Sequence, residues 1–382
     1  MLRNTLLVAV SLLLALALCE GLLRIFGQEM LPKPGLYELD PETGKRMRPG
    51  WTGNEFGAPV EINSLGLRNP EISYARTPGR YRILALGDSW TFGFRLEEAD
   101  SYPRQLETVL NQRARASGEP ANIEVINSGV IGYSTAQEAA YLRARGARFE
   151  PDLIVVAFYP VNDTHHKLRK YQRYNRLRAI HPLLLEIYRV PRQLYLRQFI
   201  KGARQALKQR TSDLRDWLTR DSIGDDSHAP PDASGARKRF KKSYDNWADA
   251  YRPGRSEWET ARSALLEIGD TSREIGAEAL VVLLPDLPDL SRYEFRDHPQ
   301  VEPLLREAVA EAGLDWLDLL DTLRPWRGRE EEIQFSGLRH PNARGYRIIA
   351  EAVADRIEAL YLKPARDPEQ ASEFESDAFA SR

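Results

Sequence analysis

The sequence contains a single cysteine, and this scarcity limits what can hold the fold together. Among 382 residues the only cysteine is Cys19, which lies inside an apolar run near the N-terminus. An intramolecular disulfide and a cysteine-based zinc cluster are therefore excluded. Folding must rest on packing of the chain.

Several ligand-binding motifs are also missing. The chain has no glycine loop for phosphates, no dinucleotide fingerprint, no His-Glu-x-x-His metal pair and no acidic calcium loop. Its positive and negative charges nearly cancel, with a formal net charge of −1, so the charge of the whole chain indicates no partner. We expect neither a cofactor nor a metal ion.

Residues 1–30 are predicted to be a membrane anchor or an export signal. An uncharged run begins at Thr5, and the apolar stretch extends to Phe26, which is about the length needed to span a bilayer as a helix. A cleaved signal peptide is the alternative, because Ala15-Leu-Ala17 fits a small-residue cleavage site. Leu18, directly before the cysteine, disfavours a lipoprotein. Both readings predict that the rest of the chain is exported.

Two segments of the chain lack a regular pattern. Residues 31–79 are rich in Pro and Gly and are predicted to be a connecting region with some packing of its own. Within it, Asn63-Ser-Leu-Gly-Leu-Arg68 has turn chemistry, so we expect a loop docked on the main domain, or else a short hairpin. Residues 363–382 mix charge with Pro, Ser and Ala and are predicted to be disordered.

Strand and helix patterns alternate between residues 80 and 362, which we interpret as one catalytic domain. Strands are expected at 83–86, 123–126, 152–158, 279–284 and 315–319, and helices at 102–116, 135–148, 256–275, 299–312 and 343–362. The strands lack a polar face, which indicates a parallel sheet covered on both sides. The predicted fold class is α/β, a three-layer αβα sandwich.

A basic insertion, residues 164–255, interrupts this alternation. Between Lys167 and Arg215 there are fourteen Lys or Arg residues against only Glu186 and Asp213. Tyrosines and leucines are interleaved with these charges, which predicts basic amphipathic helices that bind an anionic lipid surface or an acidic polysaccharide. A solvated helical lid is the alternative. Nucleic acid is not expected as a partner, because the domain is predicted to be exported.

Ser89 lies where a strand becomes a helix, within Arg80-Tyr-Arg-Ile-Leu-Ala-Leu-Gly-Asp-Ser-Trp-Thr-Phe-Gly93. Gly87 permits the tight turn, and the free backbone N–H groups at a helix start favour negative charge beside the serine hydroxyl. Acyl transfer through a serine requires such a setting. The alternative is that Asp88 or Ser89 only caps the helix.

Three further stretches lie at the carboxyl ends of predicted strands or before the last helix, where open α/β sheets bind ligands. They are Asn127-Ser-Gly-Val-Ile-Gly132, Tyr159-Pro-Val-Asn-Asp163 and Gly337-Leu-Arg-His-Pro-Asn342. With the Ser89 stretch they resemble, in order and in setting, the four signature blocks of the SGNH or GDSL hydrolase family. The resemblance implies a flavodoxin-like central sheet.

The resemblance also implies a role for one residue of each block. Ser89 becomes the nucleophile and His340 the general base, while the Gly132 N–H and the Asn162 side-chain amide line the oxyanion hole. Ester chemistry requires these groups, since a hydroxyl needs a base and a developing oxyanion needs fixed donors. Taken singly, a glycine turn, an Asx turn or a helix-entry histidine would explain each position equally well.

Two positions depart from the family pattern. Pro160 replaces the glycine that precedes the asparagine by two residues, which removes no donor that the mechanism uses. Gly337 replaces the usual aspartate three residues before the histidine. His340 then needs a backbone carbonyl or another carboxylate, such as Asp321 or Glu332, to fix its tautomer.

The expected function is therefore that of a serine esterase acting on O-acyl groups, often acetyl. The apolar anchor followed by the loop ending at Arg68 looks like membrane-tethered bacterial members of the superfamily, several of which act on surface polysaccharides. We expect a protein held at the periplasmic face of the inner membrane. Acyl transfer to a sugar hydroxyl is one alternative, and a catalytically inactive glycan-binding or assembly protein is the other.

Overall fold

The computed structural model of the protein describes residues 35–164, 247–285, 287, 290, 300–335 and 339–362, with residues 7, 10–11 and 14–22 near the N-terminus. Most of the predicted insertion, the predicted tail and most of the predicted anchor lie outside these residues. Among the helices of the described part, none is long and apolar enough to cross a membrane. The anchor, the basic helices and the disordered tail stay predictions.

Five parallel strands form the central sheet. They are β5 (Tyr81–Leu86), β6 (Ile123–Asn127), β7 (Leu153–Phe158), β8 (Glu278–Leu283) and β9 (Asp315–Asp318). Their order is β6-β5-β7-β8-β9, with β5 and β7 as neighbours at the point where the winding reverses. This is the flavodoxin-like order of doubly wound folds, and ligands bind such sheets at the carboxyl ends of the strands. The predicted α/β class with a parallel sheet is confirmed.

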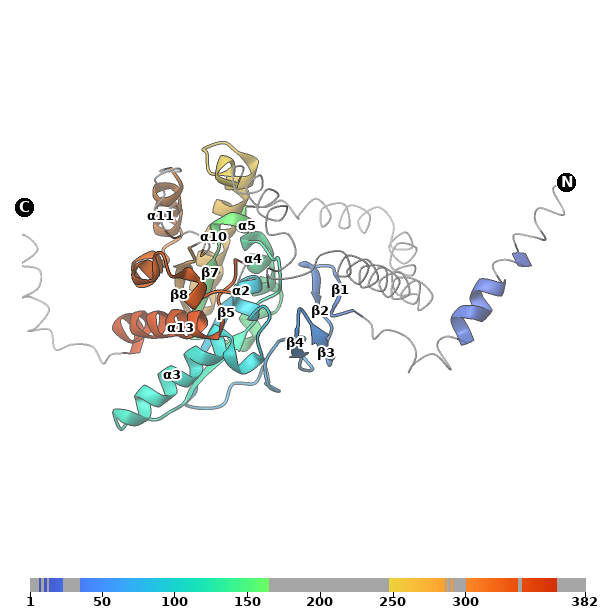
Figure 1. Ribbon diagram of the computed structural model, residues 1–382, viewed down its shortest axis with the longest axis horizontal. Coiled ribbons are helices and arrows are strands. Elements are labelled where there is room, and N and C mark those ends of the chain that lie inside the picture. Colours follow the sequence, from blue (N-terminus) through green and yellow to red (C-terminus); the bar gives the residue numbers. More distant parts are fainter. Residues whose placement is uncertain are drawn as a thin grey trace, which may run out of the picture.

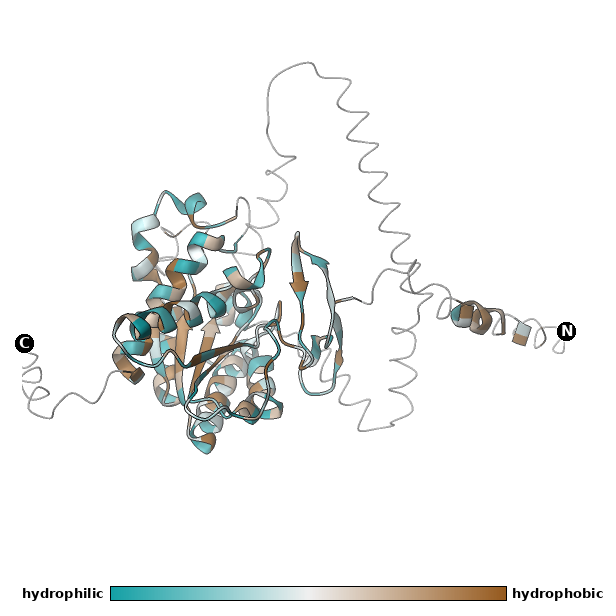
Figure 2. Ribbon diagram, turned by 90° about the horizontal axis from the view of Figure 1, so that it is seen from below, coloured by the Kyte–Doolittle hydropathy of each residue, from teal (hydrophilic) through white to brown (hydrophobic). Residues whose placement is uncertain are grey.

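Helices cover both faces of this sheet. They are α3 (Tyr102–Ala116), α4 (Thr135–Ala144), α10 (Ser256–Ile275), α11 (Val301–Glu311) and α13 (Ala343–Ile357). Helix α3 packs against α13, whereas α10 packs against both α4 and α11, and Figure 1 shows these two groups on opposite sides of the strands. The hydrophobic strands lie between the helices (Figure 2). The predicted three layers are confirmed.

Two antiparallel hairpins occupy part of the predicted connecting region. Strands β1 (Tyr37–Asp40) and β2 (Gly44–Met47) form the first, and β3 (Thr52–Glu55) and β4 (Ala58–Glu61) form the second. Both lie beside the α/β layers (Figure 1). The sequence did not predict these strands, which are four residues long with few aliphatic side chains.

The segment that follows the second hairpin is docked on the main domain, as predicted. Asn63 Oδ1 accepts hydrogen bonds from the N–H groups of Leu65 (3.0 Å) and Leu67 (2.9 Å), which closes the turn. The fully buried Arg68 then donates to the carbonyl oxygens of Phe92 (2.9 Å) and Gly93 (2.7 Å). This loop therefore contacts the end of the helix that begins at Ser89.

Candidate active site

A tight turn after β5 presents Ser89. Asp88 caps helix α2 (Ser89–Phe92), and its Oδ1 accepts the Trp90 N–H at 2.8 Å. A Cβ atom at Gly87 would lie 2.0 Å from Thr91 Oγ1, so glycine is needed where the strand passes this helix. Asp88 is therefore the cap, and Ser89 is the first helical residue. Among the described residues no hydrogen bond uses the Ser89 N–H as donor.

His340 meets Ser89 across the sheet edge. Its Nε2 lies 2.8 Å from Ser89 Oγ, which is hydrogen-bond distance. The histidine belongs to the segment before α13, and its carbonyl oxygen accepts the Phe335 N–H at 3.1 Å. Two residues 251 positions apart in the sequence thus form the contact that a nucleophile and its general base require.

Aromatic side chains surround the His340 imidazole. The ring of Phe94 lies 4.5 Å from it and that of Trp90 lies 6.3 Å from it, measured between centroids. Burial disfavours the charged imidazolium and lowers the pKa of His340 to about 4. The imidazole is therefore neutral at neutral pH and able to accept a proton.

The carboxylates named from the sequence do not contact His340. Asp321 pairs with Arg324 at 2.8 Å, and Glu332 pairs with Arg344 at 2.9 Å. Within the described part of the chain, no Asp or Glu forms an ion pair or hydrogen bond with this histidine. Gly337, the position of the usual aspartate, lies outside the described residues. The proposal that Asp321 or Glu332 supports His340 is therefore wrong for this arrangement.

Asn162 is linked to the turn that presents Ser89 through Asp88. It lies in α5 (Pro160–Asp163), directly beyond β7, and its Nδ2 donates to Asp88 Oδ2. The same carboxylate oxygen lies 3.4 Å from Ser89 Oγ. Pro160 is the first residue of α5, where its missing N–H costs nothing. Sequence reasoning treated Asp88 only as a cap and missed that it also holds the Asn162 amide.

Gly132 lies in the loop after β6, which runs beside the turn that presents Ser89. The Val130 N–H donates to the Gly87 carbonyl at 3.1 Å. A Cβ atom at Gly129 would lie 2.4 Å from the backbone nitrogen of Phe92, so this loop approaches α2 at backbone contact. Gly132 has a left-handed φ of 71°. Its role as an oxyanion donor stays a prediction, as do the roles of Ser89, Asn162 and His340.

A buried glutamic acid lies close behind the site. Glu138 of α4 is 1% exposed, and neither of its carboxyl oxygens has a hydrogen-bond partner among the described residues. Burial raises the pKa of Glu138 well above its usual value, and the negative charges of Asp163 and Asp88 raise it further. Its surroundings therefore favour the protonated carboxyl group over the carboxylate. Nothing in the sequence pattern singled it out.

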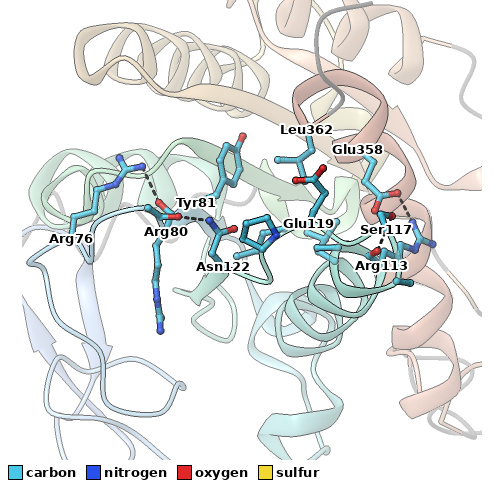
Figure 3. Close-up of a pocket in the computed structure, with 15 residues that line it drawn as sticks. Arg76, Arg80, Tyr81, Arg113, Ser117, Glu119, Asn122, Glu358 and Leu362 are labelled. Carbon is cyan, nitrogen blue, oxygen red and sulfur yellow. Dashed lines mark hydrogen bonds and ion pairs between the residues drawn. The ribbon is translucent and has the colours of Figure 1, made fainter.

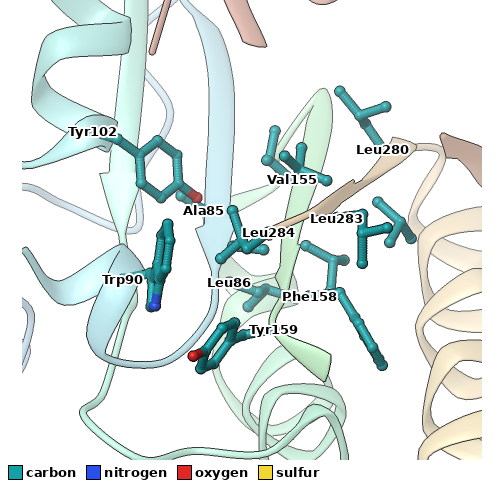
Figure 4. Packing of buried hydrophobic residues seen from close by; sticks show 14 of the residues in the cluster. Ala85, Leu86, Trp90, Tyr102, Val155, Phe158, Tyr159, Leu280, Leu283 and Leu284 are labelled. Carbon is teal, nitrogen blue, oxygen red and sulfur yellow. The ribbon is translucent and has the colours of Figure 1, made fainter. Parts of the chain in front are cut away.

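The core beneath Ser89 is aromatic. Trp90 is fully buried, and Figure 4 shows it between Tyr102 and Tyr159. The Tyr159 ring is 5.4 Å from the Trp90 ring. Because Tyr159 directly precedes α5, this packing fixes the position of Asn162 relative to Ser89.

A doubly wound α/β fold with a serine–histidine pair at the carboxyl ends of its strands is typical of one class of serine hydrolases. The profile of the GDSL-like lipase/acylhydrolase family matches residues 85–348, which is more than half of the chain. The chain belongs to this family and is a hydrolase acting on ester bonds. No curated protein shows significant similarity to it.

Several solved structures are similar over most of their length. The psychrotrophic esterase EstA from Pseudoalteromonas sp. is 13% identical, with a TM-score of 0.38, covering 74% of this chain and 99% of that one. TesA is 14% identical, with a TM-score of 0.40, covering 73% and 99%. The acetyl xylan esterase AlAXEase is 10% identical, with a TM-score of 0.39, covering 72% and 99%. Nothing about the substrate of this chain follows from similarities at this level.

Proposed function

We propose that this hydrolase is a serine esterase that removes O-acyl groups, acetyl foremost, through an acyl-enzyme on Ser89. The observation that carries the proposal is the distance of 2.8 Å between His340 Nε2 and Ser89 Oγ. This contact also counts against the inactive binding protein, because a chain that had lost its chemistry would have no reason to keep it.

The reaction begins when Ser89 Oγ attacks the acyl carbon and His340 Nε2 takes the hydroxyl proton. The oxyanion that forms is stabilised by the Asn162 amide and by the N–H groups of Ser89 and Gly132. One such donor typically lowers the barrier by about 3 kcal/mol. The C–O bond to the alcohol then breaks, and the leaving oxygen takes the proton from His340. Water repeats the sequence and releases the acid.

The low pKa of His340 makes it a weaker base than the histidine of a complete triad. General bases work best when their pKa is near the operating pH, and a value of about 4 lies below neutrality. No carboxylate among the described residues stabilises the imidazolium that forms in the transition state. We therefore propose that catalysis relies more on the oxyanion donors than on the base.

We propose an acylated surface glycan as the substrate. The predicted export of the chain and the predicted basic insertion support this substrate. Transfer of the acyl group to a sugar hydroxyl uses the same first half-reaction, because water and sugar differ only as the second nucleophile.

Acetate release tests the proposal. Purified protein is incubated with a small acetyl ester and with an O-acetylated oligosaccharide, and acetate is followed by NMR. We expect turnover by the natural protein and none by Ser89→Ala, with circular dichroism unchanged. Turnover that survives in Ser89→Ala would refute a Ser89 acyl-enzyme.

A further inference from the structure

The second hairpin reaches the catalytic histidine through a row of aromatic rings. The ring of Phe56, in the turn between β3 and β4, lies 5.0 Å from that of Phe94. The ring of Phe94 lies 4.5 Å from the His340 imidazole. Phe56 and Phe94 are both half-buried, so each keeps part of its surface open to a ligand.

Phe56 adopts a backbone conformation that its turn requires but that a phenylalanine disfavours. Glu55 pairs with Ala58, so Phe56 and Gly57 form a two-residue hairpin turn with φ values of 57° and 87°. Such type I′ turns favour Asn-Gly, and a bulky residue with positive φ is a strained outlier. Strain of this kind concentrates at functional sites. The side chain of Phe56, rather than its turn propensity, is the reason for phenylalanine here.

Arg95 holds this turn against the active site. Its Nε donates to the Phe56 carbonyl at 3.1 Å, and Arg95 itself has a positive φ of 65°. The only other non-glycine residue with positive φ in the described part of the chain is Glu150. The Arg95 guanidinium also lies 5.9 Å from the ring of Phe335, whose N–H donates to the His340 carbonyl. Two strained residues thus contact each other beside the catalytic histidine.

Arg68 fixes the hairpin to the helix that carries the nucleophile. Its Nη2 donates to the Pro59 carbonyl of β4 at 3.2 Å, and its Nη1 donates to the Phe92 carbonyl of α2 at 2.9 Å. Because this side chain is fully buried, the link excludes water. The hairpin is therefore held in place relative to Ser89.

The chemistry of ester cleavage determines which part of a substrate the Phe94 and Phe56 rings contact. The general acid delivers its proton to the leaving oxygen, so the alcohol lies beside His340, whereas the acyl oxygen points to the oxyanion donors. Phe94 is adjacent to His340, and Phe56 is adjacent to Phe94. They therefore adjoin the alcohol portion of the ester.

We propose that Phe56 and Phe94 form a subsite for the alcohol of the ester and that this subsite selects alcohols with a flat ring face. Both an aryl ring and the C–H face of a pyranose have this shape. The inference rests on the proposed esterase function. Residue 56 lies outside the matched family region, residues 85–348, so the subsite depends on this chain's own N-terminal addition.

The test uses three acetyl esters that differ only in the alcohol: ethyl acetate, phenyl acetate and an O-acetylated methyl pyranoside. The variant is Phe56→Asn, because Asn-Gly suits the type I′ turn and keeps the hairpin while removing the ring. We expect the ratio of kcat/KM for each ring alcohol over ethyl acetate to fall about fivefold, the size of one lost aromatic contact. The melting temperature should not fall. Asn54→Ala, an exposed change on the same hairpin, is the control and should keep both ratios.

The outcomes separate the two proposals. Ratios within twofold of the natural protein, or an equal loss on all three esters, would overturn the alcohol subsite while leaving the esterase in place. A fall in the kcat/KM ratio for only one of the two ring alcohols supports the subsite and shows whether it prefers an aryl or a sugar alcohol. If the natural protein cleaves none of the three esters, the proposed function fails, and the subsite fails with it.

Discussion

The two edges of the central sheet differ in how they treat charge. At the edge where the strands begin, Arg82 Nε lies 2.7 Å from Glu124 Oε2 and Arg80 Nη1 lies 2.6 Å from Glu124 Oε1. Arg113 nearby pairs with Asp355 at 2.7 Å and with Glu358 at 2.9 Å. A hollow of about 1090 Å³ is lined in part by Arg80, Arg113 and Glu358 (Figure 3). Each of these arginines has a carboxylate partner.

At the edge where the strands end, two ionisable groups are buried or half-buried with no ion-pair partner among the described residues. Glu138 has no hydrogen-bond partner among the described residues. His340 has no carboxylate partner among them and instead packs against Phe94. Only at this edge does a serine hydroxyl lie within hydrogen-bond distance of an imidazole in the described structure.

This difference in charge pairing indicates which edge of the sheet holds the active site. Ion pairs hold neighbouring segments together and stabilise the fold. Unpaired buried ionisable groups destabilise it, and such groups are concentrated at functional sites. A search for the active site by cavity size alone would have selected the amino edge, where the hollow lies. The unpaired ionisable groups instead indicate the carboxyl edge, where Ser89 and His340 meet.

Among variants that keep Ser89 and His340, the largest effect is expected from Asn162→Ala at the carboxyl edge. Loss of one oxyanion donor should lower kcat about 100-fold to 1000-fold on a small acetyl ester. The matched control is Asn122→Ala at the opposite edge, which should change kcat by less than about twofold. A loss below threefold for Asn162→Ala would show that this amide does not face the oxyanion.

The pH dependence of kcat/KM should reveal the lowered pKa of His340. Since the neutral imidazole is the active form and burial lowers its pKa to about 4, activity should persist to pH 5 and fall only below that. An ordinary histidine, with a pKa of about 6.5, would lose roughly tenfold at pH 5.5. An acidic limb near pH 6.5 would mean that a partner stabilises the imidazolium.

Glu138→Gln should stabilise the protein in alkaline solution. The folded-state pKa of Glu138 is raised, so folding keeps a proton that the unfolded chain loses above about pH 4.5, and stability falls as pH rises. The neutral Gln removes this loss. We expect a gain in melting temperature of about 2–4 °C at pH 8 and no gain at pH 4. Equal effects at both pH values would contradict a raised pKa of Glu138.

The smallest effect is expected from Arg113→Ala at the amino edge. Its two ion pairs are partly exposed, and such pairs contribute about 0–1 kcal/mol. Activity should stay within twofold and the melting temperature within about 2 °C. A tenfold loss of activity would show that this edge takes part in the reaction after all.

Long periodic segments were predictable from the sequence, because their own side chains determine their buried faces. Helices α3 and α10 begin and end at the predicted residues. Helix α4 was predicted to reach Arg148 but ends at Ala144, because the chain must turn where Gly146 packs against Leu84. The two hairpins were missed because contacts with distant residues, such as those of Arg68, stabilise them.

The positions proposed as catalytic could be named from the sequence because each follows a strand or precedes a helix in a recognisable block. Ser89 and His340 meet as the sequence suggested. The supporting residues were not predictable. Phe56 comes from a hairpin with no pattern of its own, and the raised pKa of Glu138 depends on its burial beside Asp163 and Asp88. Such properties arise only when the segments come together.

Labelling with a fluorophosphonate tests the central claim most directly, because an activated serine forms a covalent phosphonate ester with it. Intact-mass and peptide mass spectrometry should find one adduct on Ser89 in the natural protein. Ser89→Ala should give no adduct, and His340→Ala should label far more slowly. An unlabelled natural protein, or an adduct on another serine with Ser89 unmodified, would contradict the account.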